Sequence, residues 1–261
     1  MKDILQEIAK NKRREIYDLY PYEYKEPKDI KHLPLPPVYS MKKSLQNTPA
    51  GIIAEFKRRS PSKGEISPMA DVNKIVRQYH NGGAAALSIL TDTRFFGGAI
   101  TDLAMATKLS GEIPVLRKDF IVSKIQIKEA RKLGASAILL IAAILTQNEM
   151  KEFHDYAHYL DLEVLTEIHE PGELDKITYQ PDMLGVNNRN LSSFQTDVNH
   201  SYELIKSLPD DILLVAESGI KSPEDIKRLK DVGFTGFLIG EAFMSTPNPG
   251  ETLRRFVNES R

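Results

Sequence analysis

The chain has 261 residues, 41% of them hydrophobic, which suits one large α/β domain with a sizeable core and argues against disorder. Its formal net charge is −1 and it has no cysteine, which excludes a basic nucleic-acid-binding face, disulfides, thiolate metal sites and a thiol nucleophile. The first residues are charged and no apolar run approaches about 20 residues, so we expect a cytoplasmic protein without a signal peptide or a membrane span.

The first 50 residues predict an N-terminal extension to the main domain. From Asp3 to Tyr20, apolar residues recur between charges at the helical period, as in an amphipathic helix. Six prolines follow between residues 21 and 49, and they forbid a long helix and suit an extended crossing. We expect residues 1–50 to cover the mouth of the domain that follows.

From Ile52 onward, short apolar runs alternate with segments of helical period. The runs are Ile52–Lys57, Ala86–Leu90, Pro114–Asp119, Ala137–Ala142, Glu163–Ile168, Met183–Asn187, Leu213–Glu217 and Gly236–Gly240. Ser222 and Pro223 together form a helix start signal. Eight strand-then-helix units predict a (β/α)8 TIM barrel over residues 51–261, which forms a single domain with the extension. The alternative, a doubly wound open sheet, usually has fewer strands and a glycine-rich turn after the first.

Polar side chains interrupt the predicted strands at their carboxyl ends, although buried parallel strands should be almost continuously apolar. A barrel places its active site at this end. Glu55 and Lys57 are two residues apart, so both can point into the mouth. The other such residues are Ser88, Arg117, Lys118, Asp119, Thr166, Glu167, Asn187, Asn188, Arg189, Glu217 and Ser218. A charged residue at the end of one strand could belong to a buried ion-pair network that only stabilises the barrel. Charged or polar residues at the ends of five strands indicate an acid–base active site instead.

Two glycines predict where a phosphate group binds. Gly219 follows the seventh predicted strand, and Gly240 ends the eighth, just before a short helical segment that starts at Glu241. Barrel enzymes often bind phosphate at backbone amides after these two strands. We therefore expect a small phosphorylated substrate.

Seven strand-end motifs, taken in order, resemble those of the indole-3-glycerol phosphate synthase family. They are IIAEFKRRSPS at 52–62, LSILT at 87–91, LRKDFIV at 116–122, LTEI at 165–168, GVNNR at 185–189, AESGI at 216–220 and LIG at 238–240. The resemblance runs from about Ile4 to the C-terminus. It implies a TIM barrel with an N-terminal helical extension. It also implies that 1-(2-carboxyphenylamino)-1-deoxyribulose 5-phosphate becomes indole-3-glycerol phosphate, with loss of CO₂ and water.

The resemblance also implies roles for five catalytic residues. Lys118 matches the acid that protonates the ketone oxygen during ring closure, and Glu167 matches the base of the dehydration. Lys57 would hold the substrate carboxylate and act as the second acid, and Glu55 would orient it. Asn187 completes the catalytic set.

The remaining implied residues bind the substrate. Those that line the substrate pocket are Ser88, Arg189, Glu217 and Ser218. Those that hold the phosphate are Ser60, Gly219, Gly240 and Glu241. The side chain of Glu241 should turn away from the phosphate, because only its backbone amide can attract an anion. No cofactor, metal or nucleic acid is implied, and we expect a monomer.

Three other interpretations are weighed against this one. A phosphoribosyl isomerase usually relies on an aspartate pair or an Asp/Cys pair at strand ends, and this chain has no cysteine. A Schiff-base aldolase would use a lysine such as Lys118 as its nucleophile. A barrel without catalytic activity would not need the acid–base set. Finally, His154 and His158 have the i, i+4 spacing of a metal site, but their helix should lie outside the barrel, so we expect no metal there.

Overall fold

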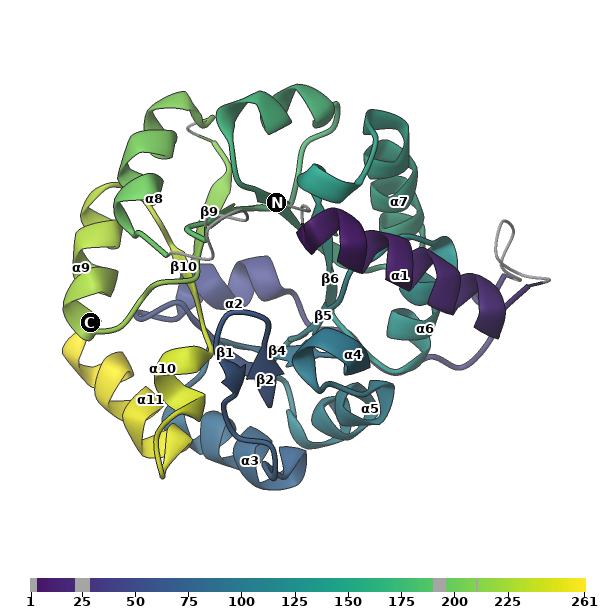
Figure 1. Cartoon of the computed structure of the whole chain (residues 1–261). Helices are drawn as coiled ribbons and strands as arrows, with labels where there is room; N and C mark the ends of the chain where they lie inside the picture. The colour runs from purple at the N-terminus through teal and green to yellow at the C-terminus, as the bar shows by residue number, and fades with distance from the viewer. Residues whose placement is uncertain (1–3, 22–28, 190–195, 210) are drawn as a thin grey trace.

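The computed structural model describes residues 4–21, 29–189, 196–209 and 211–261. Eight parallel strands close into a barrel in the order β1-β10-β9-β8-β7-β6-β5-β4 (Figure 1). They are β1 (Ile52–Phe56), β4 (Ala86–Leu90), β5 (Val115–Lys118), β6 (Ala137–Ile141), β7 (Glu163–Ile168), β8 (Met183–Asn187), β9 (Leu213–Glu217) and β10 (Gly236–Ile239). The predicted barrel is confirmed, and every predicted strand agrees with the structure to within one residue at each end.

Helices surround the barrel and connect its strands (Figure 1). They are α1 (Ile4–Leu19), α2 (Met41–Asn47), α3 (Val72–Gly82), α4 (Thr93–Phe96), α5 (Ile100–Leu109), α6 (Lys124–Lys132), α7 (Gln147–Tyr159), α8 (Asn199–Leu204), α9 (Pro223–Asp231), α10 (Glu241–Met244) and α11 (Pro249–Glu259). Short 3₁₀ helices span Ala142–Ile144, Pro171–Lys176 and Ile205–Ser207. The predicted start of α9 is confirmed, because the Ser222 side chain accepts a hydrogen bond from the Asp225 amide. No helix in the described part of the chain could span a membrane.

The strands are buried because helices cover their outer faces and side chains fill the barrel. Every residue of β1, β4, β6 and β9 is buried. In β5 and β8, the half-buried residues are Lys118 and Asn187, each at the carboxyl end of its strand. A two-stranded hairpin, β2 (Arg59–Ser60) and β3 (Gly64–Glu65), follows β1 at the same end. The barrel therefore opens at the carboxyl ends of its strands.

Helix α1 lies across this open end (Figure 1). Its Lys12 side chain is buried, and Nζ lies 3.0 Å from Asp92 Oδ2 and 3.3 Å from Asp119 Oδ1. Burial alone would lower the pKa of Lys12, but the carboxylates of Asp119 and Asp92 outweigh it and raise the pKa above its usual value. A buried ion pair therefore joins α1 to the chain after β4 and β5.

Helix α2 lies at the opposite end of the barrel, behind the strands in Figure 1. Glu163, the first residue of β7, accepts hydrogen bonds from the amides of Met41 at 2.7 Å and Lys42 at 3.0 Å. Met41 and Leu45 are fully buried there. The expectation that residues 1–50 cover the mouth therefore needs correction: α1 lies at the mouth, whereas α2 closes the amino end.

Candidate active site

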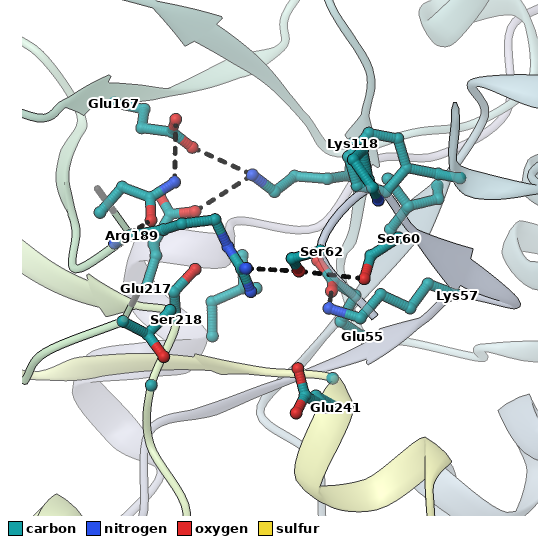
Figure 2. A pocket seen from close by; sticks show the side chains of 18 of the residues that line it. Glu55, Lys57, Ser60, Ser62, Lys118, Glu167, Arg189, Glu217, Ser218 and Glu241 are labelled. Carbon is teal, nitrogen blue, oxygen red and sulfur yellow. Dashed lines mark hydrogen bonds and ion pairs between the residues drawn. The ribbon is translucent and has the colours of Figure 1, made fainter. Parts of the chain in front are cut away.

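A cavity of about 370 Å³ opens at the carboxyl ends of the strands, a size typical of a small-molecule site. Twelve of the thirteen residues predicted for the site line it: Glu55, Lys57, Ser60, Lys118, Glu167, Asn187, Arg189, Glu217, Ser218, Gly219, Gly240 and Glu241. Figure 2 shows that the labelled side chains, which come from barrel strands and from the segments that follow them, point into one space. The cavity thus brings together residues that are far apart in the sequence.

Lys118 lies between two buried carboxylates. Its Nζ atom is 3.0 Å from Glu167 Oε2 and 3.1 Å from Glu217 Oε2 (Figure 2). Burial alone would lower the pKa of Lys118, but the carboxylates of Glu167, Glu217 and Glu55 outweigh burial and raise the pKa above its usual value. Lys118 therefore carries its proton at neutral pH and can deliver it to a substrate oxygen.

The two glutamates that contact Lys118 differ in pKa. Burial raises the pKa of Glu217 to about 8, and the negative charge of Glu167 adds to this effect although Lys118 opposes it. Burial would also raise the pKa of Glu167, but Lys118, His169 and a hydrogen bond from Asn187 outweigh it and lower the pKa. Glu167 is therefore ionised at neutral pH and can accept a proton.

Lys57 and Glu55 form a second ion pair on the opposite wall, with Nζ 2.7 Å from Oε1 (Figure 2). The Glu55 carboxylate fits because Gly240 has no side chain: a Cβ atom there would lie 2.5 Å from Glu55 Oε1. Gly185 gives the same space to Glu217, since a Cβ atom there would lie 2.2 Å from Glu217 Oε1. Both glycines make room for a carboxylate at the site, a role for Gly185 that the sequence interpretation missed.

Arg117 and Asp119 alternate with Lys118 and belong to a different network. Arg117 Nη2 lies 3.1 Å from Asp119 Oδ2, and Nη1 lies 2.8 Å from Glu129 Oε2. Asp119 also contacts Lys12 of α1. Strand alternation explains the split, because neighbouring side chains point to opposite faces of the sheet. Lys118 therefore points into the cavity and Arg117 away from it, while Asp119, which follows the strand, both lines the cavity and contacts α1.

Groups that can bind an anion gather on the wall formed by the chain after β1 and β9. Ser218 and Gly219 both have a positive φ, of 67° and 79°, which is unusual for a serine and sets the direction of the backbone at this turn. Across the cavity, the Arg189 guanidinium donates to the Ser62 hydroxyl, and Ser60 Oγ lies 3.4 Å from Ser62 Oγ. A guanidinium and two hydroxyls suit a phosphate group.

Glu241 pairs with a neighbouring lysine at the rim of the cavity. Its Oε1 atom lies 3.2 Å from Lys63 Nζ, and both side chains are partly exposed. The pair neutralises the charge of Glu241, the first residue of α10. An unpaired carboxylate would repel an anion at the backbone amides of this turn, whereas the paired one is compatible with it.

Ser88 is the predicted site residue that does not line the cavity. It is fully buried in β4, where it is the register partner of Glu55, and its Oγ atom has no hydrogen-bond partner among the described residues. Thr166 is likewise buried, and its hydroxyl contacts the Tyr179 hydroxyl at 3.2 Å instead of the cavity. Strand alternation explains Thr166, which faces away from its neighbour Glu167, whereas Ser88 shares the face of the cavity-lining Leu90 but lies further from the carboxyl end of β4.

The structure adds an apolar wall that sequence reasoning did not assign. Phe96 and Phe120 line the cavity with ring centroids 5.9 Å apart, and apolar residues of α1 line it as well. The other apolar lining residues are Ile4, Leu5, Ile8, Leu90, Leu139, Ile141, Ile220, Leu238 and Ile239. One side of the cavity is therefore suited to an aromatic or aliphatic group, and the other to charged groups.

His169 is a second residue that the sequence interpretation missed. It is buried, it lines the cavity, and its Nε2 atom lies 3.3 Å from Glu167 Oε1. His169 stands two residues after Glu167, so the strand period that linked Glu55 to Lys57 could also have found it. A group of three possible metal ligands within the described residues, His154, His158 and Asp182, lies outside this cavity.

Comparisons with known proteins agree on one family. The family model described as indole-3-glycerol phosphate synthase matches residues 5–256. The indole-3-glycerol phosphate synthase of Bacteroides thetaiotaomicron is 51% identical, over 98% of each chain. That of Bacillus cereus is 44% identical, over 94% of each chain.

Solved structures with low sequence identity share the fold alone. Thiamine phosphate pyrophosphorylase from Pyrococcus furiosus has a TM-score of 0.62 at 16% identity, covering 85% of this chain and 99% of its own. Tryptophan synthase subunit alpha from Legionella pneumophila has a TM-score of 0.61 at 12% identity, covering 84% of this chain and 97% of its own. These likenesses support the barrel architecture.

Proposed function

Because the chain belongs to the indole-3-glycerol phosphate synthase family, we infer that it converts 1-(2-carboxyphenylamino)-1-deoxyribulose 5-phosphate to indole-3-glycerol phosphate. The reaction closes a ring and releases CO₂ and water, which makes the protein a carboxy-lyase of tryptophan biosynthesis. The observation that carries this function is a charged lysine, Lys118, held between two buried glutamates in a cavity with one apolar and one polar side. The direct test is the fluorescence of the indole product formed from the substrate.

We propose that Lys118 is the acid of ring closure. The nucleophile is the aromatic ring carbon that bears the carboxylate, and it attacks the ketone carbon of the substrate. The ketone oxygen must gain a proton as the new bond forms. The ammonium of Lys118 is held by Glu167 and Glu217, so it is positioned before the substrate binds. Loss of CO₂ then restores the electrons of the ring.

Glu167 and Lys57 are our candidates for the dehydration. Elimination of water requires a base to remove a proton and an acid to protonate the leaving hydroxyl. Glu167 has a lowered pKa and is ionised, and Asn187 donates to its Oε1 atom at 3.2 Å. Lys57 is paired with Glu55 at the end of β1, where it can first hold the substrate carboxylate.

The two sides of the cavity suggest how the substrate lies. The anilino ring would pack against Phe96, Phe120 and the apolar residues of α1. The phosphate would take the backbone amides near Gly219 and Gly240, with Ser60 and Arg189 nearby. This orientation places the reacting carbons between Lys118 and Lys57.

Two rival functions make different predictions about Lys118. A Schiff-base aldolase would form an imine between Lys118 and a carbonyl substrate, so borohydride would trap a covalent adduct. The proposed acid role forms no such bond. A barrel without activity would bind the substrate but release no fluorescent indole. We further propose that the protein is a cytoplasmic monomer that does not bind nucleic acid.

The first prediction concerns metals. Dialysis against EDTA is expected to leave kcat/KM unchanged, because lysine and glutamate supply the acid and base of each step. The three possible metal ligands of the described chain lie outside the cavity. A large loss of activity that one divalent ion restores would contradict the acid–base mechanism.

The second prediction concerns α1. Removing residues 1–20 should lower kcat/KM by about 10–200-fold, because the cavity loses the apolar contacts of Ile4, Leu5 and Ile8. The melting temperature should fall much less than in the longer deletion described next, because Asp92 and Asp119 become hydrated when Lys12 is removed. Steady-state kinetics and thermal melting measure the two effects.

A longer deletion provides the contrast. Removing residues 1–47 also takes away the fully buried Met41 and Leu45 of α2, each worth about 2–5 kcal/mol of folding free energy. This variant should therefore lose stability strongly. If the shorter deletion left kinetics unchanged and lowered the melting temperature instead, α1 would have only a structural role.

A further inference from the structure

A group of three potential metal ligands lies on the outside of the barrel. His154 and His158 are one turn apart on α7, and Asp182 directly precedes β8. Each residue offers one ligand atom, and these atoms all lie within 4.8 Å of one another. Asp182 accepts a hydrogen bond from the amide of Val164, near the start of β7, so the group lies toward the amino ends of the strands. That end is opposite the active-site cavity.

His154 is the buried member of the group. It is 6% exposed, and its Nε2 atom has no hydrogen-bond partner in the described part of the chain. Its Nδ1 atom lies 3.4 Å from Asp155 Oδ1, which leaves Nε2 as the nitrogen available to a ligand. Burial of an unpaired ring nitrogen is unfavourable. A ligand bound at Nε2 would satisfy this buried nitrogen.

The other contacts of the group hold it in place. The His154 ring lies between two rings, with centroids 4.1 Å from His158 and 4.0 Å from Tyr179. His158 Nε2 lies 2.8 Å from Asp182 Oδ2, and the same oxygen accepts the Val164 amide at 2.8 Å. The Val164 amide orients the Asp182 carboxylate before a metal binds, and the metal would take the place of the hydrogen bond between His158 and Asp182. His158 is half exposed, so an ion can enter from solvent.

We propose that His154, His158 and Asp182 form a Zn²⁺ site. Two imidazole nitrogens and one carboxylate oxygen are donors that Zn²⁺ prefers, and water would complete a tetrahedron. With metal–ligand distances of about 2.0–2.2 Å, the most distant ligand atoms must approach by about 1 Å, which rotation of the exposed His158 side chain allows. The metal would link α7 to the residue before β8. It stabilises the barrel at its amino end and takes no part in catalysis.

The test measures Zn²⁺ binding to the full chain after removal of bound metal by EDTA. Calorimetry with ZnCl₂ should show one site, and Co²⁺ should give the visible absorption of a tetrahedral ion. His158→Ala and Asp182→Asn should each weaken Zn²⁺ binding by about 10-fold or more, because each removes one of three ligands. His80→Ala is the matched control, since His80 is an exposed helical histidine outside the group, and it should bind Zn²⁺ as the parent does.

A second measurement separates this site from the catalytic function. At about 100 times the dissociation constant, Zn²⁺ should raise the melting temperature of the parent and of the control by about 5 °C. The two site variants should show about half of this rise or less, and kcat/KM should stay the same with and without Zn²⁺. The proposal is overturned if the parent binds no Zn²⁺ at micromolar concentrations. It is also overturned if His158→Ala and Asp182→Asn bind Zn²⁺ as tightly as His80→Ala does.

Discussion

Replacing Lys118 with alanine is expected to lower kcat by about 10²–10⁴-fold, the usual contribution of a positioned general acid. Ring closure would then have no ammonium to protonate the ketone oxygen. Lys57, at the end of β1, is held in its own pair with Glu55 and does not replace Lys118. KM should change much less than kcat, because the proposed contacts to the phosphate and the carboxylate of the substrate remain. Single-turnover and steady-state kinetics with the purified variant measure both effects.

The experiment with Lys118→Ala must distinguish a loss of catalysis from a loss of folding stability. Without Lys118, Glu167 and Glu217 remain buried next to each other, and breaking a buried pair of this kind costs about 3–5 kcal/mol. The double variant Lys118→Met and Glu217→Gln replaces one of the two buried carboxyl groups by a neutral amide and should restore stability without restoring turnover. Lys227→Ala, at an exposed lysine of α9, is the control for loss of a positive charge. Turnover of Lys118→Ala within a few-fold of the parent would remove Lys118 from the acid role.

The second large effect is expected from Glu167→Gln. Glutamine keeps the size of the side chain but accepts no proton, so the dehydration loses its base and kcat should fall by about 10²–10⁴-fold. Lys118 keeps its contact with Glu217, so the fold should be retained. If dehydration becomes rate-limiting, the ring-closed intermediate should accumulate, and rapid quenching with mass analysis can detect it.

Glu217→Gln is the matched control for this experiment. Both glutamates are buried and both contact Lys118, but burial and the charge of Glu167 raise the pKa of Glu217. Glu217 is therefore poorly suited to accept a proton at neutral pH, and its amide variant should lose much less activity than Glu167→Gln. An equal or larger loss in Glu217→Gln would assign the base to Glu217 instead.

The sequence by itself determined the barrel and most of the site. Few folds other than a closed barrel fit eight apolar runs that alternate with helical segments. The parallel strands of a closed barrel bring their carboxyl ends together at one mouth. Glu55 and Lys57 could be paired from the strand period alone, and the structure places their charged atoms 2.7 Å apart. These features follow from local spacing, which is why they can be read without coordinates.

Only the tertiary structure decided the features that depend on contacts between distant segments. Helices α1 and α2 lie at the two ends of the barrel, because Lys12 pairs with Asp92 at the mouth while Glu163 binds the start of α2 at the other end. Asp182 joins His154 and His158 across more than twenty residues of sequence. The partner of a buried charge is set by the packing of whole elements, and residue spacing along one chain segment carries no information about it.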